Sequence, residues 1–71
     1  MPLVWSYKNN GNKLTIEYKE ENSHLIIFNG KRCFLENCNL NRLSKVISGV
    51  LNDPKIKFSK ILGTNLLYLE K

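Results

Sequence analysis

The sequence has few of the residues that small proteins use for cross-links or metal sites. Its 71 residues include two cysteines and one histidine. Two cysteines exclude the dense disulfide framework of a small secreted scaffold. A structural zinc site needs four ligands, commonly in close pairs. The chain offers Cys33, Cys38 and His24 and has no CxxC motif. The sequence therefore predicts no metal ion and no cofactor.

Long apolar runs are also missing. No segment approaches the roughly 20 apolar residues of a membrane-spanning helix. The N-terminal MPLVWSYK has neither the basic nor the apolar region of a signal peptide. We expect a soluble, cytoplasmic protein with reduced thiols and no membrane association. The length predicts a single domain, residues 1–71, that buries only about 60% of the surface its unfolded chain exposes.

Catalytic constellations are absent as well. The six acidic residues are scattered, and no motif places a nucleophile near His24. The glycine-containing segments NNGN and FNGK are typical of hairpin turns rather than phosphate-binding loops. We therefore expect a protein that is not an enzyme. Both cysteines are predicted to be packing residues, Cys33 in the core and Cys38 at a strand-to-helix junction.

Two Asn-Gly pairs predict two β-hairpins, because Asn-Gly supplies the positive-φ positions of a type I′ turn. Pairing outward from the first turn sets Trp5 opposite Ile16 and Leu3 opposite Tyr18. One face of this hairpin is then apolar and consists of Leu3, Trp5, Tyr7, Leu14, Ile16 and Tyr18. The second hairpin pairs Ile26 with Cys33 and is apolar on both faces, which predicts a central position in the sheet.

The segment after the hairpins has the spacing of an amphipathic helix. Its apolar residues are Leu40, Leu43, Val46, Ile47, Val50 and Leu51, and its polar residues are Asn41, Arg42, Ser44, Lys45, Ser48 and Asn52. Asn39 is the predicted N-cap, and Pro54 ends the helix near Asn52. Gly49 is expected to allow close approach to the sheet.

These elements predict a two-layer α+β domain, an antiparallel sheet of two hairpins packed by one helix. The strands are expected near 3–8, 13–19, 24–28 and 31–36, and the helix near 40–52. One or two short C-terminal strands are expected near 55–59 and 65–70. The pattern leaves open whether they extend the sheet or mediate self-association in a homodimer.

Basic residues outnumber acidic ones by eleven to six, which gives a net charge of +5. We attribute part of this excess to AT-rich codons, since nine of the eleven are lysines and ten other residues are asparagine. The remainder suits single-stranded nucleic acid, in which cations contact phosphates and aromatic rings stack on bases. The candidate binding residues are Lys8, Lys13, Lys31, Arg32, Lys55 and Lys57.

Four strands followed by a helix, over residues 3–52, is an order similar to that of whirly-type single-stranded-DNA-binding folds. This resemblance implies the same class of partner. Stacking on the first hairpin would require exposed rings of Trp5, Tyr7 and Tyr18. Alternatively, these rings lie in the core beneath the helix. The nucleic acid would then be bound through its phosphates alone.

A second hypothesis is an accessory or inhibitor protein, of the kind that phages and viruses encode, acting through protein–protein contacts. Its interface would be the outer side of the second hairpin, formed by Leu25, Ile27 and Phe34. Alternatively, the C-terminal strands would add to the edge of a partner's sheet.

Overall fold

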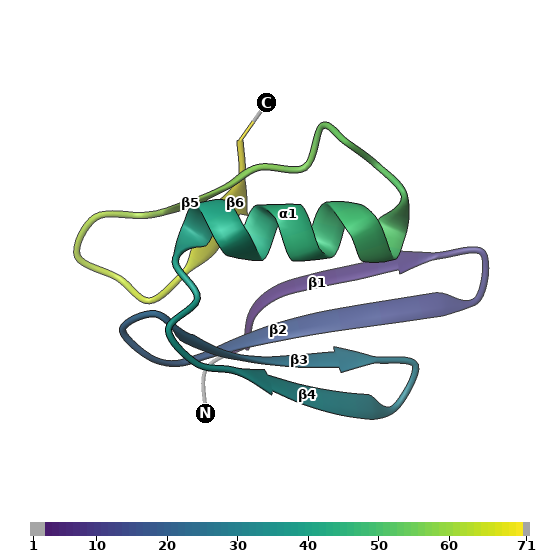
Figure 1. Cartoon of the computed structure of the whole chain (residues 1–71), viewed down its shortest axis with the longest axis horizontal. Helices are drawn as coiled ribbons and strands as arrows, with labels where there is room; N and C mark the ends of the chain where they lie inside the picture. The colour runs from purple at the N-terminus through teal and green to yellow at the C-terminus, as the bar shows by residue number, and fades with distance from the viewer. Residues whose placement is uncertain (1–2, 71) are drawn as a thin grey trace.

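The computed structural model describes residues 3–70, with side chains from Trp5 onward, and contains two sheets and one helix (Figure 1). Strands β1 (Leu3–Asn9), β2 (Asn12–Glu20), β3 (Ser23–Phe28) and β4 (Lys31–Leu35) form an antiparallel sheet in chain order. Helix α1 (Leu40–Leu51) follows, and β5 (Phe58–Lys60) pairs with β6 (Leu67–Leu69). The predicted two-layer α+β architecture is confirmed.

The first hairpin has the predicted register beside its turn, with Trp5 opposite Ile16. Asn10 and Gly11 have φ values of 50° and 81°, as a type I′ turn requires. The predicted pairing of Leu3 with Tyr18 is wrong. Leu3 lies opposite Glu17, because a β-bulge between Leu3 and Trp5 adds a residue to β1. The place of the Leu3 side chain in the apolar patch lies outside the described residues.

The second hairpin also has the predicted register, with Ile26 opposite Cys33. Its inner strand β3 is buried on both faces, at Leu25 and Ile26. The predicted central position is wrong for β4, which is an edge strand. Cys33 is therefore exposed and not part of the core, since an edge strand has a neighbour on one side only.

The core lies between α1 and the sheet. Leu14 and Ile16 of β2 meet Leu43 and Ile47 of α1, and none of the four has exposed surface. The other buried members are Ile26, Cys38, Ile56, Phe58 and Leu67. The burial of Cys38 confirms its predicted packing role where the chain passes from β4 to α1.

Asparagines define both ends of α1. The side-chain Oδ1 of Asn39 accepts a hydrogen bond from the backbone N–H of Arg42 at 2.9 Å, as an N-cap does. Asn52 adopts the left-handed conformation, with φ of 55°, and ends the helix before Pro54. Both predicted boundaries are confirmed.

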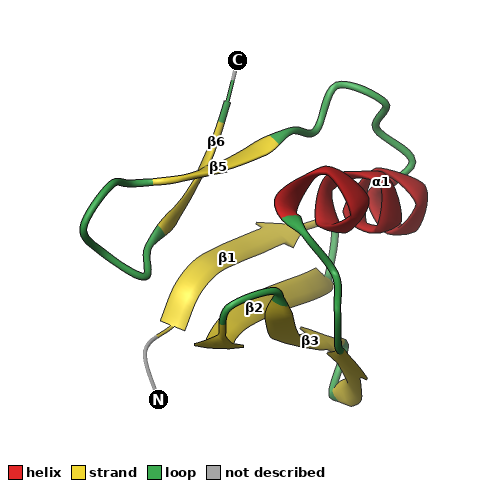
Figure 2. Ribbon diagram, turned by 60° about the vertical axis from the view of Figure 1, so that its left-hand side comes forward, coloured by secondary structure: helices red, strands yellow, loops and turns green. Residues whose placement is uncertain are grey.

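The C-terminal segment packs beside α1 and near β1, on the same side of the large sheet as the helix (Figure 2). Ser44, predicted to be on the exposed face of the helix, is buried. Its Oγ accepts a hydrogen bond from the N–H of Phe58 at 2.7 Å. The Phe58 ring packs edge-on against Trp5, with centroids 4.9 Å apart. The small sheet thus closes one side of the core and does not extend the large sheet.

Two further helix predictions are wrong. Val50, assigned to the apolar face, is exposed. Gly49 has nothing within 4 Å of where a Cβ would lie, so it does not serve a close approach to the sheet.

Candidate nucleic-acid interface

The negative side chains of the large sheet lie toward one end, and its positive side chains, apart from Lys19, lie toward the other. Because β1 to β4 pair in chain order, the β1–β2 and β3–β4 turns share one end and the β2–β3 turn lies at the other (Figure 1). The first end, here called the basic end, holds four of the six predicted cations and no carboxylate: Lys8, Lys13, Lys31 and Arg32. The carboxylates lie toward the opposite end, at Glu17, Glu20, Glu21 and Glu36.

Lys8 and Lys13 lie directly opposite each other on β1 and β2. The N–H of Lys13 donates to Asn29 Oδ1 at 2.8 Å, and its carbonyl accepts from the Asn29 N–H at 2.9 Å. Because these groups point toward β3, the two lysines form a non-hydrogen-bonded pair, in which Cα atoms are about 4.5 Å apart. Like charges at this separation repel, and a bound anion would relieve the repulsion.

Neither lysine has a carboxylate partner. Among the described residues the one ion pair is between Lys19 and Glu17, at 3.9 Å. The turns of the basic end are held together by amides instead. Asn29 Nδ2 donates to Asn12 Oδ1 at 3.1 Å, which links the two hairpins. The basic end is therefore a positively charged surface on a hydrogen-bonded support.

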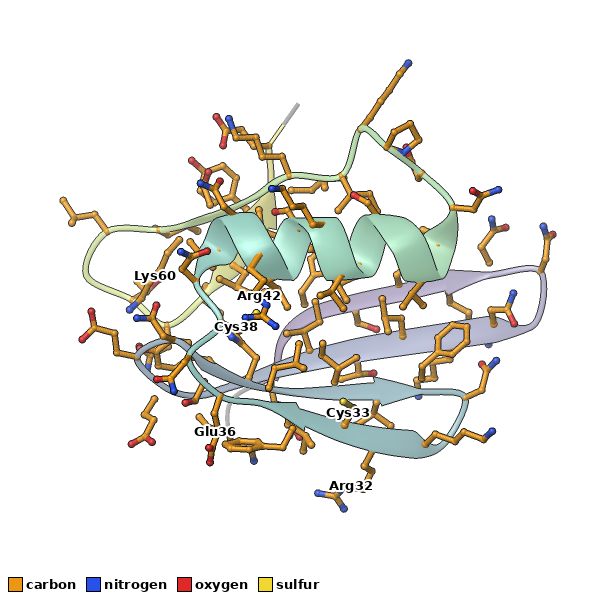
Figure 3. All side chains as sticks on the ribbon, in the orientation of Figure 1. Arg32, Cys33, Glu36, Cys38, Arg42 and Lys60 are labelled. Carbon is orange, nitrogen blue, oxygen red and sulfur yellow. The ribbon has the colours of Figure 1, made fainter. Side chains whose placement is uncertain are left out.

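The face of the sheet away from α1, here called the outer face, carries an exposed aromatic ring beside Arg32. Figure 3 shows Arg32 pointing away from the helix and Cys33 pointing toward it. Phe34, two residues beyond Arg32 on β4, shares the outer face and is 47% exposed. The Cα atoms of Arg32 and Phe34 are roughly 7 Å apart at the usual strand rise.

The six cations predicted to bind nucleic acid lie in two separate parts of the structure. Lys55 and Lys57 lie on segment 52–57, which α1 separates from the sheet (Figure 1). They do not join the basic end. The residues predicted as a protein interface, Leu25, Ile27 and Phe34, share the outer face. Leu25, however, is only 6% exposed, so the accessible part is Phe34 with some of Ile27.

The aromatic rings of the first hairpin pack against the core. Trp5 and Tyr7 stack with centroids 5.9 Å apart, and Tyr18 also packs on the buried cluster. Of the two arrangements predicted for these rings, the structure therefore has the one in which they pack beneath the helix. Phe34 is the exposed ring on the outer face, although the sequence pattern assigned it to a protein interface. Its register opposite Leu25 was the signal that placed it outside.

A pocket of about 360 Å³ lies at the other end of the sheet, lined by Tyr18, Glu21, Asn22, His24, Leu40 and Lys60. His24 is 1% exposed, and neither ring nitrogen has a hydrogen-bond partner. The Lys60 ammonium lies 4.6 Å from the Tyr18 ring centroid and 3.4 Å from its hydroxyl oxygen. Burial lowers the pKa of His24, and the nearby charge of Lys60 lowers that pKa further.

We expect the free energy of unfolding to decrease as the pH falls from about 7.5 to 5.5. The unfolded chain binds a proton at His24 near its ordinary pKa of 6.5, whereas the folded chain does so only at lower pH. The stabilisation is complete above the unfolded pKa and is lost as the pH drops toward the folded one. Urea unfolding across this range measures it. His24→Leu removes the chain's one histidine and should give a flat profile; an equally flat parent profile would contradict the prediction.

The thiols and acidic groups form no cluster with metal-binding geometry in the described part of the chain. Cys33 and Cys38 are both free, and burial raises the pKa of the Cys38 thiol. Within residues 3–70, no helix is long and apolar enough to cross a membrane.

Comparison with known proteins does not identify a family. No family model matches the chain, and no match was found among curated proteins or solved structures. The likeness in element order to whirly-type folds gains no support from these comparisons, and the chemistry of the surface itself must indicate the function.

Proposed function

We propose that the protein binds single-stranded nucleic acid at the basic end and outer face of its sheet, without catalysing a reaction. The main support is the grouping of Lys8, Lys13, Lys31 and Arg32 at one end of the sheet with no carboxylate among them. Phosphate groups would supply the negative charge that this end lacks. We further propose a cytoplasmic location, where the protein would meet nucleic acid and where Cys33 and Cys38 would stay reduced.

Phe34 supplies the stacking surface in this proposal. Its ring is exposed, lies on a strand, and is next to Arg32 on the same face. A base can stack on the ring while its phosphates contact the neighbouring cations, which gives binding with little sequence preference. The half-buried Trp5 packs against Phe58 on the helix side, so we expect no quenching of its fluorescence by the oligonucleotide.

Phe34→Ala should weaken binding of a fluorescent oligothymidylate by about 5- to 150-fold, the range for losing one stacked base. Fluorescence anisotropy at about 50 mM salt, where electrostatic binding is strong, measures this. Tyr68→Ala is the matched control, because Tyr68 is 45% exposed but lies on β6 in the small sheet. Equal losses in the two variants, or no binding by the parent protein, would refute the proposed site.

A protein partner is the second candidate function, favoured by exposed apolar side chains in the C-terminal segment. Leu62 is 98% exposed, and the others are Ile61, Leu66, Tyr68 and Leu69. Apolar patches of this kind mark interaction surfaces of accessory or inhibitor proteins and of homodimers. Size-exclusion chromatography with light scattering, run with and without oligonucleotide, separates the two functions. A dimer that does not shift with oligonucleotide would favour the second.

A further inference from the structure

Strand β4 has a free edge that is suited to pairing with another strand. It pairs with β3 on one side, and no strand in the described part of the chain pairs with its other side. At the opposite edge of the sheet, by contrast, β1 contacts β6. The pairing of β4 with β3 has no bulge, and β4 contains no proline. Two common protections of an exposed edge are therefore missing.

The free backbone groups of this edge belong to Arg32 and Phe34. Just beyond β3, the N–H of Asn29 donates to the carbonyl of Lys13 on β2 at 2.9 Å. The odd-numbered residues of β3 therefore direct their backbone groups toward β2. Arg32 and Phe34 lie opposite two of these residues. They form non-hydrogen-bonded pairs with β3, and their N–H and C=O groups point to the free edge.

Arg32, Phe34 and Glu36 place a positive, an aromatic and a negative side chain at equal steps along this edge. Figure 3 shows Arg32 and Glu36 pointing away from α1, on the outer face with Phe34. All three are exposed, and neither charged residue forms an ion pair within the described residues. A segment with opposite charges at equal distances from its centre is complementary to an antiparallel copy of itself.

We propose that a second copy of the chain pairs with this edge about a two-fold axis at Phe34, which joins two four-stranded sheets into one. Phe34 then lies opposite the partner's Phe34, and Arg32 lies opposite the partner's Glu36 in two symmetric ion pairs. On the helix side, Cys33 meets the partner's Leu35. Opposed Cα atoms in hydrogen-bonded pairs are about 5.5 Å apart, which lets these side chains touch.

Neighbouring registers pair these side chains less well. An axis at Arg32 would oppose two like charges, and an axis at Cys33 would set Glu36 opposite the partner's Gly30. A shift that opposes even to odd residues would align the free backbone groups with groups already bonded to β3. Only the axis at Phe34 satisfies the backbone and both charges together.

This inference goes beyond the proposed nucleic-acid function and does not depend on it. Pairing at the edge leaves the outer face of Phe34 uncovered, and it leaves Lys8, Lys13 and Lys31 to contact phosphates. It also uses none of the exposed apolar residues of the C-terminal segment. An edge strand of five residues gives a small interface, so we expect a reversible dimer that forms at high protein concentration.

Charge reversal tests the register. In sedimentation experiments up to about 1 mM protein, where a weak dimer is populated, Arg32→Glu and Glu36→Arg should each weaken dimerisation at least about tenfold. An equimolar mixture of the two variants should dimerise as the parent does, because each opposed pair then combines a positive and a negative side chain. Lys57→Glu is the matched control, since Lys57 is exposed on segment 52–57, and it should leave the dimer unchanged.

Hydrogen exchange of the ¹⁵N-labelled parent tests the pairing without any variant. Raising the protein concentration should slow exchange at the N–H groups of Arg32 and Phe34, whereas Cys33, already bonded to β3, should change little. Neither measurement uses an oligonucleotide, so the result is separate from that of the proposed function.

Three results would overturn the proposal. They are a parent that stays monomeric at the highest concentration, a dimer that neither charge reversal weakens, and exchange at Arg32 and Phe34 that does not depend on concentration. A mixture of the two variants that stays monomeric, although circular dichroism shows both to be folded, would also overturn it. If either variant fails to fold, the exchange measurement on the parent decides.

Discussion

Leu43→Ala or Ile47→Ala should lower the free energy of unfolding by about 2–5 kcal/mol. Both side chains are fully buried between α1 and the sheet, against Leu14 and Ile16. Truncation removes buried apolar surface and leaves a cavity that the close-packed surroundings fill only in part. A domain of 71 residues has a total stability of about 4–11 kcal/mol. Either variant would therefore lose a large share of the folded population.

Urea unfolding followed by circular dichroism measures this loss. Val50→Ala is the matched control on the same helix, because Val50 is exposed. We expect it to change stability by no more than about 0.5 kcal/mol. Changes this small at both Leu43 and Ile47 would show that the apolar stripe of α1 does not carry the core.

Oligonucleotide affinity should fall about 20- to 50-fold when salt rises from about 50 to 200 mM. Each phosphate contact on a single strand contributes roughly −0.7 to the log–log slope, so the three or four cations of the basic end predict a slope of about −2 to −3. All six cations predicted from the sequence would give a slope of about −4 and a loss of about 300-fold. The salt dependence thus distinguishes one clustered site from charge distributed over the whole molecule.

Single lysine variants locate the contacts. Lys8→Gln and Lys13→Gln should each flatten the slope by about 0.7 and weaken binding to every sequence alike, because phosphate contacts carry no sequence information. Lys55→Gln and Lys57→Gln are the controls, since segment 52–57 lies beyond α1 from the sheet. If all four variants flatten the slope equally, the basic end is not the binding surface.

The sequence by itself determined the elements whose signals are local. The Asn-Gly pairs specify tight turns, and strict alternation fixes which residues face the helix, so both hairpin registers next to their turns were predictable. The helix was equally clear, because apolar spacing, the Asn39 cap and Pro54 agree. The bulge near Leu3 could not be predicted, since no turn-forming or polar residue marks its position.

Only the tertiary structure decided the position of the small sheet and what it exposes. Its three-residue strands carry a weak periodic signal, and contacts between distant residues position them, such as Ser44 with Phe58 and Trp5 with Phe58. The same holds for Cys33 and Phe34, whose exposure follows from β4 being the edge of the sheet. The alternation of apolar and polar residues along a strand indicates which face of the sheet each residue is on. Whether another element then covers it depends on packing between segments far apart in the chain, and this packing also brought His24, Leu40 and Lys60 around one pocket.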